Sequence, residues 1–111
     1  MLLHVVPLDA WSAAPEVPYA PPSLAEEGFV HCSPDEQAAL AVADAHYRDV
    51  PGPLLVLVID EARLGAEVRW EGSEDQLYPH VYGPVERAAV TAVLEVRRDA
   101  DGRAGELAPW A

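Results

Sequence analysis

The sequence predicts one α+β domain with several short strands, one main helix and short helical turns. Its 111 residues can bury one substantial core but not two, and half of them are hydrophobic. Short apolar runs rich in β-branched residues accompany a single long helical pattern. We expect the domain over residues 1–97. Residues 98–111, rich in Gly, Ala and Asp, are expected to form a partly flexible tail, loose until Trp110.

The chain is expected to begin with a strand followed by a helical turn. Residues 2–6 are apolar and β-prone, and Pro7 stops the strand because it has no amide hydrogen to donate. Residues 8–11 predict a brief helical turn. Asp9 is its expected N-cap, since an Asp side chain accepts hydrogen bonds from the free amides of a first turn.

A stiff loop and a second helical turn come next. Four prolines between positions 15 and 22 favour an extended backbone. Residues 23–28 predict one helical turn with Ser23 as its cap. Gly28 is the expected stop, because glycine adopts the left-handed conformation that ends helices.

The main helix is predicted after a short strand over residues 29–32. Ser33 is a favourable N-cap, Pro34 suits the first helical position, and Glu36 has the capping-box spacing. We expect this helix to run to about Tyr47, where a loop with two prolines and a glycine follows.

The C-terminal half is predicted to be mostly strand. Residues 54–59 are continuously apolar, which favours a central strand buried on both faces. Residues 66–71 alternate, as in a half-exposed strand, and residues 74–78 are polar and loop-like. A last strand is predicted over residues 90–96.

The charge of the chain argues against several classes of function. Nineteen acidic and seven basic residues give a formal net charge of −12, which repels nucleic acid. All seven cations are arginines, so no lysine is present to form a Schiff base. The single cysteine, the absence of a signal-peptide pattern and the short apolar runs favour a cytoplasmic protein that neither crosses nor binds a membrane.

Three of the four histidines lie in short motifs that could form one pocket. His4 and His31 lie within or at the end of β-prone runs, where a polar ring must be hydrogen-bonded or functional. His4 taken alone is best interpreted as a satisfied core residue; two strand-borne histidines together favour a shared cleft. His46 has the surroundings of a surface residue.

His31, Cys32 and Ser33 form the most concentrated candidate site. They lie where a strand is expected to pass into a helix N-terminus, whose free amides favour anions. A ligand phosphate or carboxylate could rest there with His31 as a donor. The plainer alternative makes Ser33 only the helix cap and His31 a satisfied buried ring. Cys32 is more often a small core residue than a nucleophile.

The third histidine lies in a stretch that we expect to be a stiff loop. In residues 78–84, two prolines, two tyrosines and a glycine surround His80, and stiffness suits a segment that positions a ligand. Glu71 offers a carboxylate at the end of the preceding strand. Its alternative role is that of a solvated edge charge.

Other chemistries have weaker signals. The histidines could hold zinc, but no close-spaced pair of ligands is present. The sequence also lacks the serine elbow of common hydrolases and a glycine-rich phosphate loop. We therefore expect no metal.

These motifs resemble the bacterial family called domain of unknown function 952, over roughly residues 2–96. The resemblance is carried by Leu3-His4-Val5, Trp11, Tyr19, Ser23-Leu24, the run Glu27-Gly28-Phe29-Val30-His31-Cys32-Ser33, Gln37, Glu71 and Pro79-His80-Val81-Tyr82-Gly83. The family is remotely similar to the ADP-ribosyltransferase-like fold, which implies a small split or mixed β-sheet that grips NAD in a cleft.

The resemblance implies a role for each candidate residue. His4 would bind the adenosine ribose, His31 would lie against the nicotinamide, and Ser33 would lie near the nicotinamide ribose. The late glutamate of such transferases is matched by His80 or by the earlier Glu71, a departure from the pattern. The implied catalytic residues are His31, His80 and Glu71, and the implied cofactor-binding residues are His4, Ser33, Tyr19 and Tyr82.

Three functions follow as expectations. The first is an ADP-ribosyltransferase-like enzyme that binds NAD or ADP-ribose in a histidine-lined cleft. The second is a non-catalytic module that binds a small molecule or nucleotide, and the third is a metal-assisted hydrolase. The chain is expected to be a monomer or a weak homodimer joined through an exposed sheet edge.

Overall fold

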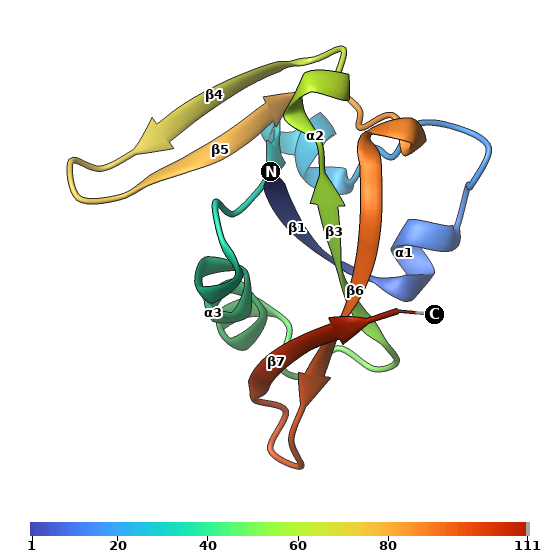
Figure 1. Cartoon of the computed structure of the whole chain (residues 1–111), viewed down its shortest axis with the longest axis vertical. Helices are drawn as coiled ribbons and strands as arrows, with labels where there is room; N and C mark the ends of the chain where they lie inside the picture. Colours follow the sequence, from blue (N-terminus) through green and yellow to red (C-terminus); the bar gives the residue numbers. More distant parts are fainter. Residues whose placement is uncertain (111) are drawn as a thin grey trace.

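The computed structural model of the protein describes residues 1–110 as two antiparallel sheets, one main helix and several short helical segments (Figure 1). The first sheet has the strand order β1 (Leu2–Pro7), β3 (Leu54–Ile59), β6 (Val90–Arg98), β7 (Ala104–Pro109). The second has the order β2 (Val30–His31), β5 (Leu77–Tyr82), β4 (Glu67–Gly72). The helical segments are α1 (Leu8–Ser12), α2 (Pro22–Glu27), α3 (Glu36–His46) and the 3-10 turns η1 (Glu61–Arg63) and η2 (Arg87–Ala89).

The predicted α+β class is confirmed, and its sheets are antiparallel throughout the described chain. All five strand pairings are antiparallel, so the expected mixed sheet is corrected. Strand β3 lies between β1 and β6, as its continuous apolar sequence predicts. Its side chains alternate between two cores: Leu55 and Leu57 belong to one, and Leu54 and Val56 to the other.

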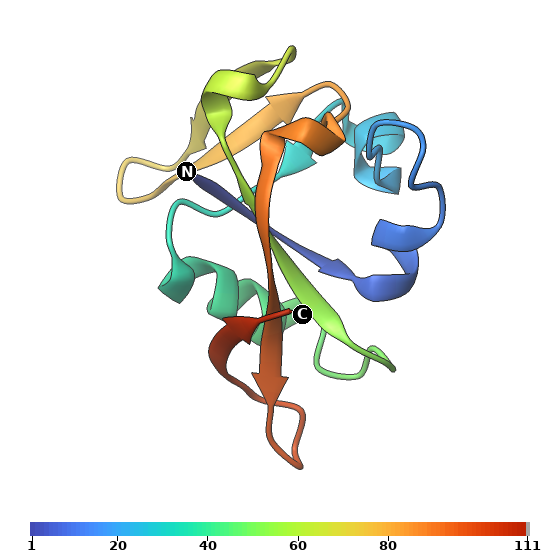
Figure 2. The same cartoon turned by 45° about the vertical axis from the view of Figure 1, so that its right-hand side comes forward.

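The two cores explain how the layers stack. The inner face of the second sheet, with Val30 and Val81, packs into the core that contains Leu55 and Leu57. On the other face of the first sheet, Ala39 and Ala43 of α3 pack into the second core. Figure 2 shows α3 beside the crossing strands of the first sheet, with the β4–β5 hairpin above it and the turn between β6 and β7 at the bottom of the view. Burial of these apolar faces is the main driving force for the arrangement.

Helix α3 begins later than the sequence predicts. Its N-cap is Asp35, whose Oδ1 accepts a 2.8 Å hydrogen bond from the amide of Ala38. The expected cap, Ser33, is only 3% exposed, and its backbone exchanges two hydrogen bonds with Leu3. Because this bridge to β1 holds Ser33 extended, the helix begins only after the chain has left the sheet. The expected roles of Ser33 as cap and Pro34 as first helical residue are therefore wrong.

The two shorter helices also lack the expected side-chain caps. Helix α1 begins directly after Pro7 and α2 after Pro21, and neither has a side-chain hydrogen bond at its N-cap. Asp9 lies inside α1 and Ser23 inside α2, so neither is a cap. Proline sets the backbone of a helix start without any side-chain bond. Gly28 ends α2 at a φ of 90°, as predicted, and its amide donates to the carbonyl of Leu24.

The expected stiff loop around His80 is strand β5. Pro79 lies within this strand, and its carbonyl accepts from the amide of Cys32. The backbone N and O of a strand residue point to the same side, so the nitrogen of Pro79, which carries no hydrogen, also faces β2. It lies beyond the end of this two-residue strand. The pairing of β5 with β4 therefore loses no hydrogen bond.

The expected loose tail is also corrected. Residues 104–109 form β7, which pairs with β6 from Leu94 to Arg98. Leu107 packs into the core covered by α3, and the amide of Trp110 donates to the carbonyl of Val93. A turn over residues 99–103 joins the two strands, because the Oδ1 of Asp99 accepts from the amides of Asp101 and Arg103.

Candidate functional site

A row of three nitrogen-bearing side chains crosses the outer face of the second sheet. His31 of β2 is directly opposite His80 of β5, and His80 is directly opposite Arg69 of β4. Residues that face each other in antiparallel strands point to the same side, so the three side chains share one face. The rings of His31 and His80 lie edge to face with their centroids 5.3 Å apart. The β-pairing thus brings together two of the histidines predicted to share a site.

Glu71 joins His80 and Tyr82 at one carboxylate oxygen. Its Oε1 lies 2.9 Å from Nδ1 of His80 and accepts a 2.5 Å hydrogen bond from the Tyr82 hydroxyl. These bonds, the Tyr82 bond first, lower the pKa of the Glu71 carboxyl, and the same bond raises the pKa of the Tyr82 phenol. The carboxylate is therefore ionised at neutral pH. It orients the His80 ring so that Nε2 points away from the Glu71 bond.

His31 has its own carboxylate partner and an aromatic neighbour. Its Nε2 lies 2.5 Å from Oε2 of Glu27, at the end of α2. Phe29 stacks on His80 with a centroid separation of 4.1 Å and an interplanar angle of 19°, and it lies 4.8 Å from the His31 ring. Gly28 makes this possible, because its left-handed conformation turns the chain between Glu27 and Phe29.

His4 is held in the interior by hydrogen bonds at both ring nitrogens. Its Nδ1 lies 2.6 Å from the carbonyl oxygen of His31, and its Nε2 lies 3.0 Å from the Tyr19 hydroxyl. Since a carbonyl only accepts, Nδ1 carries the proton, and Nε2 accepts from the Tyr19 O–H. Burial lowers the pKa of His4 to about 4, and burial raises the pKa of Tyr19. His4 is thus neutral at pH 7.

A hollow of about 430 Å³ lies against this buried pair. The side chains that line it include no acidic residue and no arginine, so the hollow suits an uncharged or aromatic group. Its lining residues are His4, Val5, Pro7, Ala10, Tyr19, Pro21, Pro22, Ser23, His31, Cys32, Ser33, Val42 and Tyr47. Burial raises the pKa of the Cys32 thiol to about 12, so this lining residue is a thiol and not a thiolate nucleophile at neutral pH.

The structure gathers the candidate residues into two groups that meet at His31. His31, His80, Glu71 and Tyr82 lie on the outer face of the second sheet, whereas His4, Tyr19 and Ser33 line the hollow. His31 belongs to both, since it also lines the hollow and its carbonyl accepts from His4.

Three expectations for single residues are decided by their surroundings. Ser33 precedes the Asp35 cap, so the expected anion site at a helix N-terminus is not formed around its side chain. The alternative of a buried His31 ring is wrong, because this side chain is 54% exposed. His46, expected at the surface, is exposed in the last turn of α3 and is not among the residues that line the hollow.

Sequence reasoning assigned no role to Glu27, Phe29 or Arg69, although all three contact the site. Glu27 and His31 have a spacing of four residues, and Arg69 alternates with Glu67 and Glu71 along β4. These spacings would have indicated contacts with the site only if the end of α2 at Gly28 and the register of β4 with β5 had been known.

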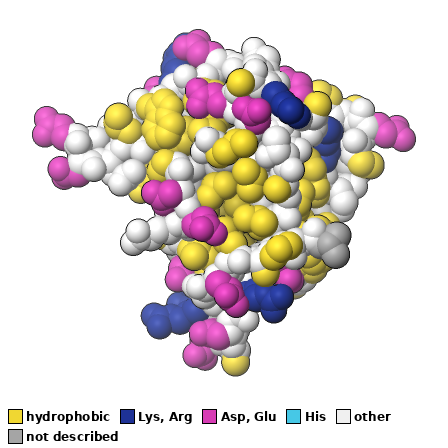
Figure 3. All heavy atoms as spheres, viewed as in Figure 1, with side chains coloured by type: hydrophobic (Ala, Val, Ile, Leu, Met, Phe, Trp, Pro, Cys, Tyr) yellow, Lys and Arg dark blue, Asp and Glu magenta, His cyan; other side chains and the backbone are white. Residues whose placement is uncertain are grey.

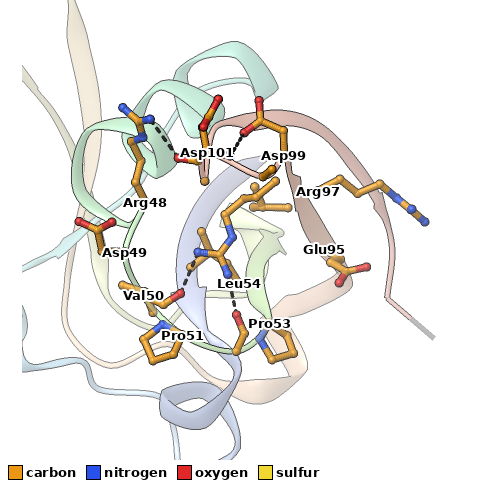
Figure 4. Close-up of a pocket in the computed structure, with 15 residues that line it drawn as sticks. Arg48, Asp49, Val50, Pro51, Pro53, Leu54, Glu95, Arg97, Asp99 and Asp101 are labelled. Atoms are coloured by element: carbon orange, nitrogen blue, oxygen red, sulfur yellow. Dashed lines mark hydrogen bonds between the residues drawn. The ribbon is translucent and has the colours of Figure 1, made fainter.

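A larger hollow at the other end of the molecule is built around an arginine. It measures about 710 Å³ and lies between residues 48–54 and 95–102 (Figure 4). The Arg98 guanidinium fills part of it and donates to the carbonyls of Tyr47, Val50 and Gly52. None of the predicted site residues lines this hollow. Its arginine fastens the loop before β3 to the end of β6.

Two further arrangements are absent from residues 1–110. No three His, Cys, Asp or Glu side chains converge in a geometry that would hold a metal ion. None of the described helices has the length and hydropathy needed to cross a membrane.

On the face drawn in Figure 3, apolar side chains fill the centre and carboxylates are spread around them. No histidine is visible on that face.

The fold and the site define a small α+β protein with two antiparallel sheets and a histidine–carboxylate cluster on the outer face of the smaller one. Residues 5–93 match the family model described as protein of unknown function DUF952. The chain belongs to this family.

The chain is similar in structure to the protein CC0527 from Caulobacter crescentus. The CC0527 structure is 25% identical in sequence and has a TM-score of 0.80, with 94% of this chain and 92% of that chain covered. The structure of a double mutant of CC0527 is 24% identical, with the same TM-score and coverage. No curated protein matches the chain.

Proposed function

We propose that the chain is an ADP-ribosyltransferase-like enzyme that binds NAD or ADP-ribose at the hollow and the histidine cluster. The observation that supports this most is the position of His31, which lines the hollow and also contacts the His80 ring. A ligand with a flat, uncharged ring in the hollow would place its attached ribose near His31. Such a ligand matches the shape of a nucleoside, such as the adenosine of NAD or ADP-ribose.

The cluster offers the groups that cleavage of a glycosidic bond needs. An ionised carboxylate stabilises the positive charge that develops on a ribosyl carbon when its C–N bond breaks. Glu71, like any solvated glutamate, is ionised at neutral pH, and its bonds to Tyr82 and His80 lower its pKa further. When NAD reacts, nicotinamide leaves with the electron pair of the C–N bond, and the acceptor that attacks the ribosyl carbon releases a proton. His80 Nε2 or the His31 ring would take this proton.

The proposal gives each remaining site residue a binding role. His4 and Tyr19 form a hydrogen-bonded wall of the hollow, and Ser33 lines it beside them. Tyr82 holds the Glu71 carboxylate by its hydroxyl. Arg69 lies over the Tyr82 ring, with 4.4 Å from its guanidinium carbon to the ring centroid, and supplies a cation beside the cluster.

NMR of the histidine side chains tests binding. Addition of NAD or ADP-ribose to millimolar concentration should shift the imidazole signals of His31 and His80 and leave those of His46 in place. His46 is the internal control, because it is exposed at the end of α3 and belongs neither to the cluster nor to the residues that line the hollow. Unchanged signals of His31 and His80 would refute the proposal.

Release of nicotinamide tests catalysis separately. The Glu71→Gln variant should release nicotinamide about 100-fold more slowly while its affinity for NAD changes only a few-fold. Glu67→Gln is the matched control on the same strand, since Glu67 pairs with Arg69 and not with a histidine. Equal rates in these two variants would show that Glu71 takes no part in the reaction.

A second function, a binding module without turnover, is favoured by one observation. Both histidine rings are already engaged, His31 by Glu27 and His80 by the stacked Phe29. A ligand that leaves these contacts in place would bind without chemistry. Saturable binding of NAD with no release of nicotinamide would support this module over the enzyme.

A further inference from the structure

Strand β4 is an open edge of the second sheet. It pairs with β5 on one side, and in the strand order β2-β5-β4 no described strand pairs with its other side. In Figure 1 the β4–β5 hairpin projects from the body of the molecule. Its backbone amides and carbonyls on the outer side are free to pair with another strand.

The hairpin also exposes large apolar side chains. Trp70 is 46% exposed and Leu77 is 48% exposed. Trp70 is paired with Pro79, and Leu77 is two residues from Pro79, so both side chains point to the same face of the hairpin. An exposed tryptophan beside an unpaired strand edge is a feature of association surfaces.

The charges on the other face of β4 alternate in a self-complementary way. Glu67, Arg69 and Glu71 point to that face in the order negative, positive, negative. Both hydrogen bonds that Glu71 accepts end on Oε1, and Oε2 accepts none from the described residues. Arg69 uses Nε and Nη2 for Glu67 and has no bond from Nη1 within residues 1–110. Each side chain therefore has an atom available for an ion pair with a second molecule.

We propose that two copies of the chain pair antiparallel through β4, with a two-fold axis at Trp70. The two small sheets then become one continuous six-stranded sheet. Trp70 faces the partner's Trp70, and Arg69 faces the partner's Glu71 at two symmetric positions. The partner's Arg69 thereby reaches the carboxylate that joins His80 and Tyr82, although the pairing does not depend on what the site binds.

Side-chain alternation and charge select this register over its neighbours. A shift by one residue between the copies would place the charged face of one strand beside the tryptophan face of the other. An axis at Arg69 would set Glu67 opposite the partner's Glu71, two like charges.

An axis at Val68 also pairs opposite charges, but it uses residues before the strand. Within the bounds of β4 it pairs only Glu67 with Arg69, because its other pairs need residues 64–66. The axis at Trp70 pairs Val68 with Gly72 and Arg69 with Glu71, all of them within the observed bounds of β4.

A cysteine placed on the axis tests the register directly. In Trp70→Cys the two sulfurs would lie opposite each other, with Cα atoms about 4.5–5.5 Å apart, within reach of a disulfide. In the control Ser73→Cys, the two sulfurs would be about 20 Å apart at about 3.3 Å per strand residue. Under mild oxidation we expect a cross-linked dimer from Trp70→Cys and monomer from Ser73→Cys. The natural Cys32 is buried and stays a thiol.

Charge reversal tests the ion pairs. In the Trp70→Cys background, Arg69→Glu should slow cross-linking at least tenfold, and adding Glu71→Arg should restore at least half of the rate. Arg97→Glu, an exposed charge on β6, is the matched control and should have no effect. Sedimentation of the unaltered chain should show a dimer.

Three results would overturn the proposal. One is equal cross-linking at positions 70 and 73, and another is failure of the double reversal to restore the rate. The third is a monomer at all concentrations up to about 1 mM, the upper limit of weak association. Circular dichroism of each variant separates loss of pairing from loss of fold.

Discussion

At the scale of single residues, the environment of His4 shows how a polar ring is accommodated in an apolar strand. In the neutral ring, Nδ1 donates to the His31 carbonyl and Nε2 accepts from the Tyr19 hydroxyl. A second proton would turn Nε2 into a donor and place a positive charge in a buried site, which costs free energy. Burial therefore keeps the His4 pKa near 4, well below its ordinary value of about 6.5.

We predict that His4 makes the protein less stable as the pH falls. The unfolded chain binds a proton at His4 near pH 6.5 and the folded chain only near pH 4, so the stability is present above pH 6.5 and is lost between these values. The loss attributable to His4 is about 3 kcal/mol. Urea unfolding at pH 7 and at pH 4.5 should show a smaller difference in His4→Asn than in the unaltered chain.

The control for this measurement is His46→Asn, which should keep the pH dependence of the unaltered chain. His46 is exposed at the end of α3, so its ring contacts water in the folded chain as it does in the unfolded chain. A pH dependence that is the same in His4→Asn and His46→Asn would contradict the assignment to His4.

At the scale of elements, the start of α3 depends on one side chain. Asp35 accepts from the amide of Ala38, and an N-cap of this kind contributes about 1 kcal/mol. We predict that Asp35→Ala lowers the free energy of unfolding by about this amount. Asp35→Asn should lower it by less, since Asn is an equally good cap. The midpoints of denaturant unfolding measure these changes. An equal loss of unfolding free energy in both variants would mean that the Asp35 cap does not stabilise the start of α3.

The limits of prediction from sequence are clearest at element boundaries. The strand over residues 54–59 was predictable because its apolar run is unbroken, and so was the stop at Gly28. The start of α3 was not, because Ser33 has the same local preference for a cap as Asp35. Only the distant Leu3, which binds both backbone groups of Ser33, distinguishes them.

The same holds for β5, β7 and the site. Pro79 disfavoured a strand on the sequence alone. A proline fits in β5 only because β2 ends before the position that Pro79 faces. β7 has little apolar character and exists because β6 offers it an edge. For the site, sequence motifs singled out the three histidines and Glu71. The bond from Tyr82 to Glu71 and the stacking of Phe29 on His80 required the register of three strands.

At the scale of the whole molecule, arginines connect parts that are distant in the sequence. Arg98 at the end of β6 donates to three carbonyls of the loop between α3 and β3. Arg87 does the same near the N-terminus, where it donates to the carbonyls of Trp11, Ala14 and Val17. Backbone carbonyls pair with these cations even though the chain carries many carboxylates.

We predict that Arg98→Ala destabilises the whole fold. Three carbonyls lose a charged donor, which corresponds to a loss of about 2–3 kcal/mol in the free energy of unfolding. Arg97→Ala is the matched control, because this neighbouring side chain is exposed, and it should change stability by less than about 0.5 kcal/mol. Urea denaturation of the two variants makes the comparison, and similar losses in both would count against the role of the Arg98 bonds.

The single thiol of the chain gives the folded molecule a built-in reporter. Cys32 is buried in the core between the two sheets and also lines the hollow beside His4. A maleimide therefore reaches its sulfur only through the hollow or when this part of the core opens locally. The rate of alkylation thus reports on access to this part of the molecule at a thiol that the chain already carries.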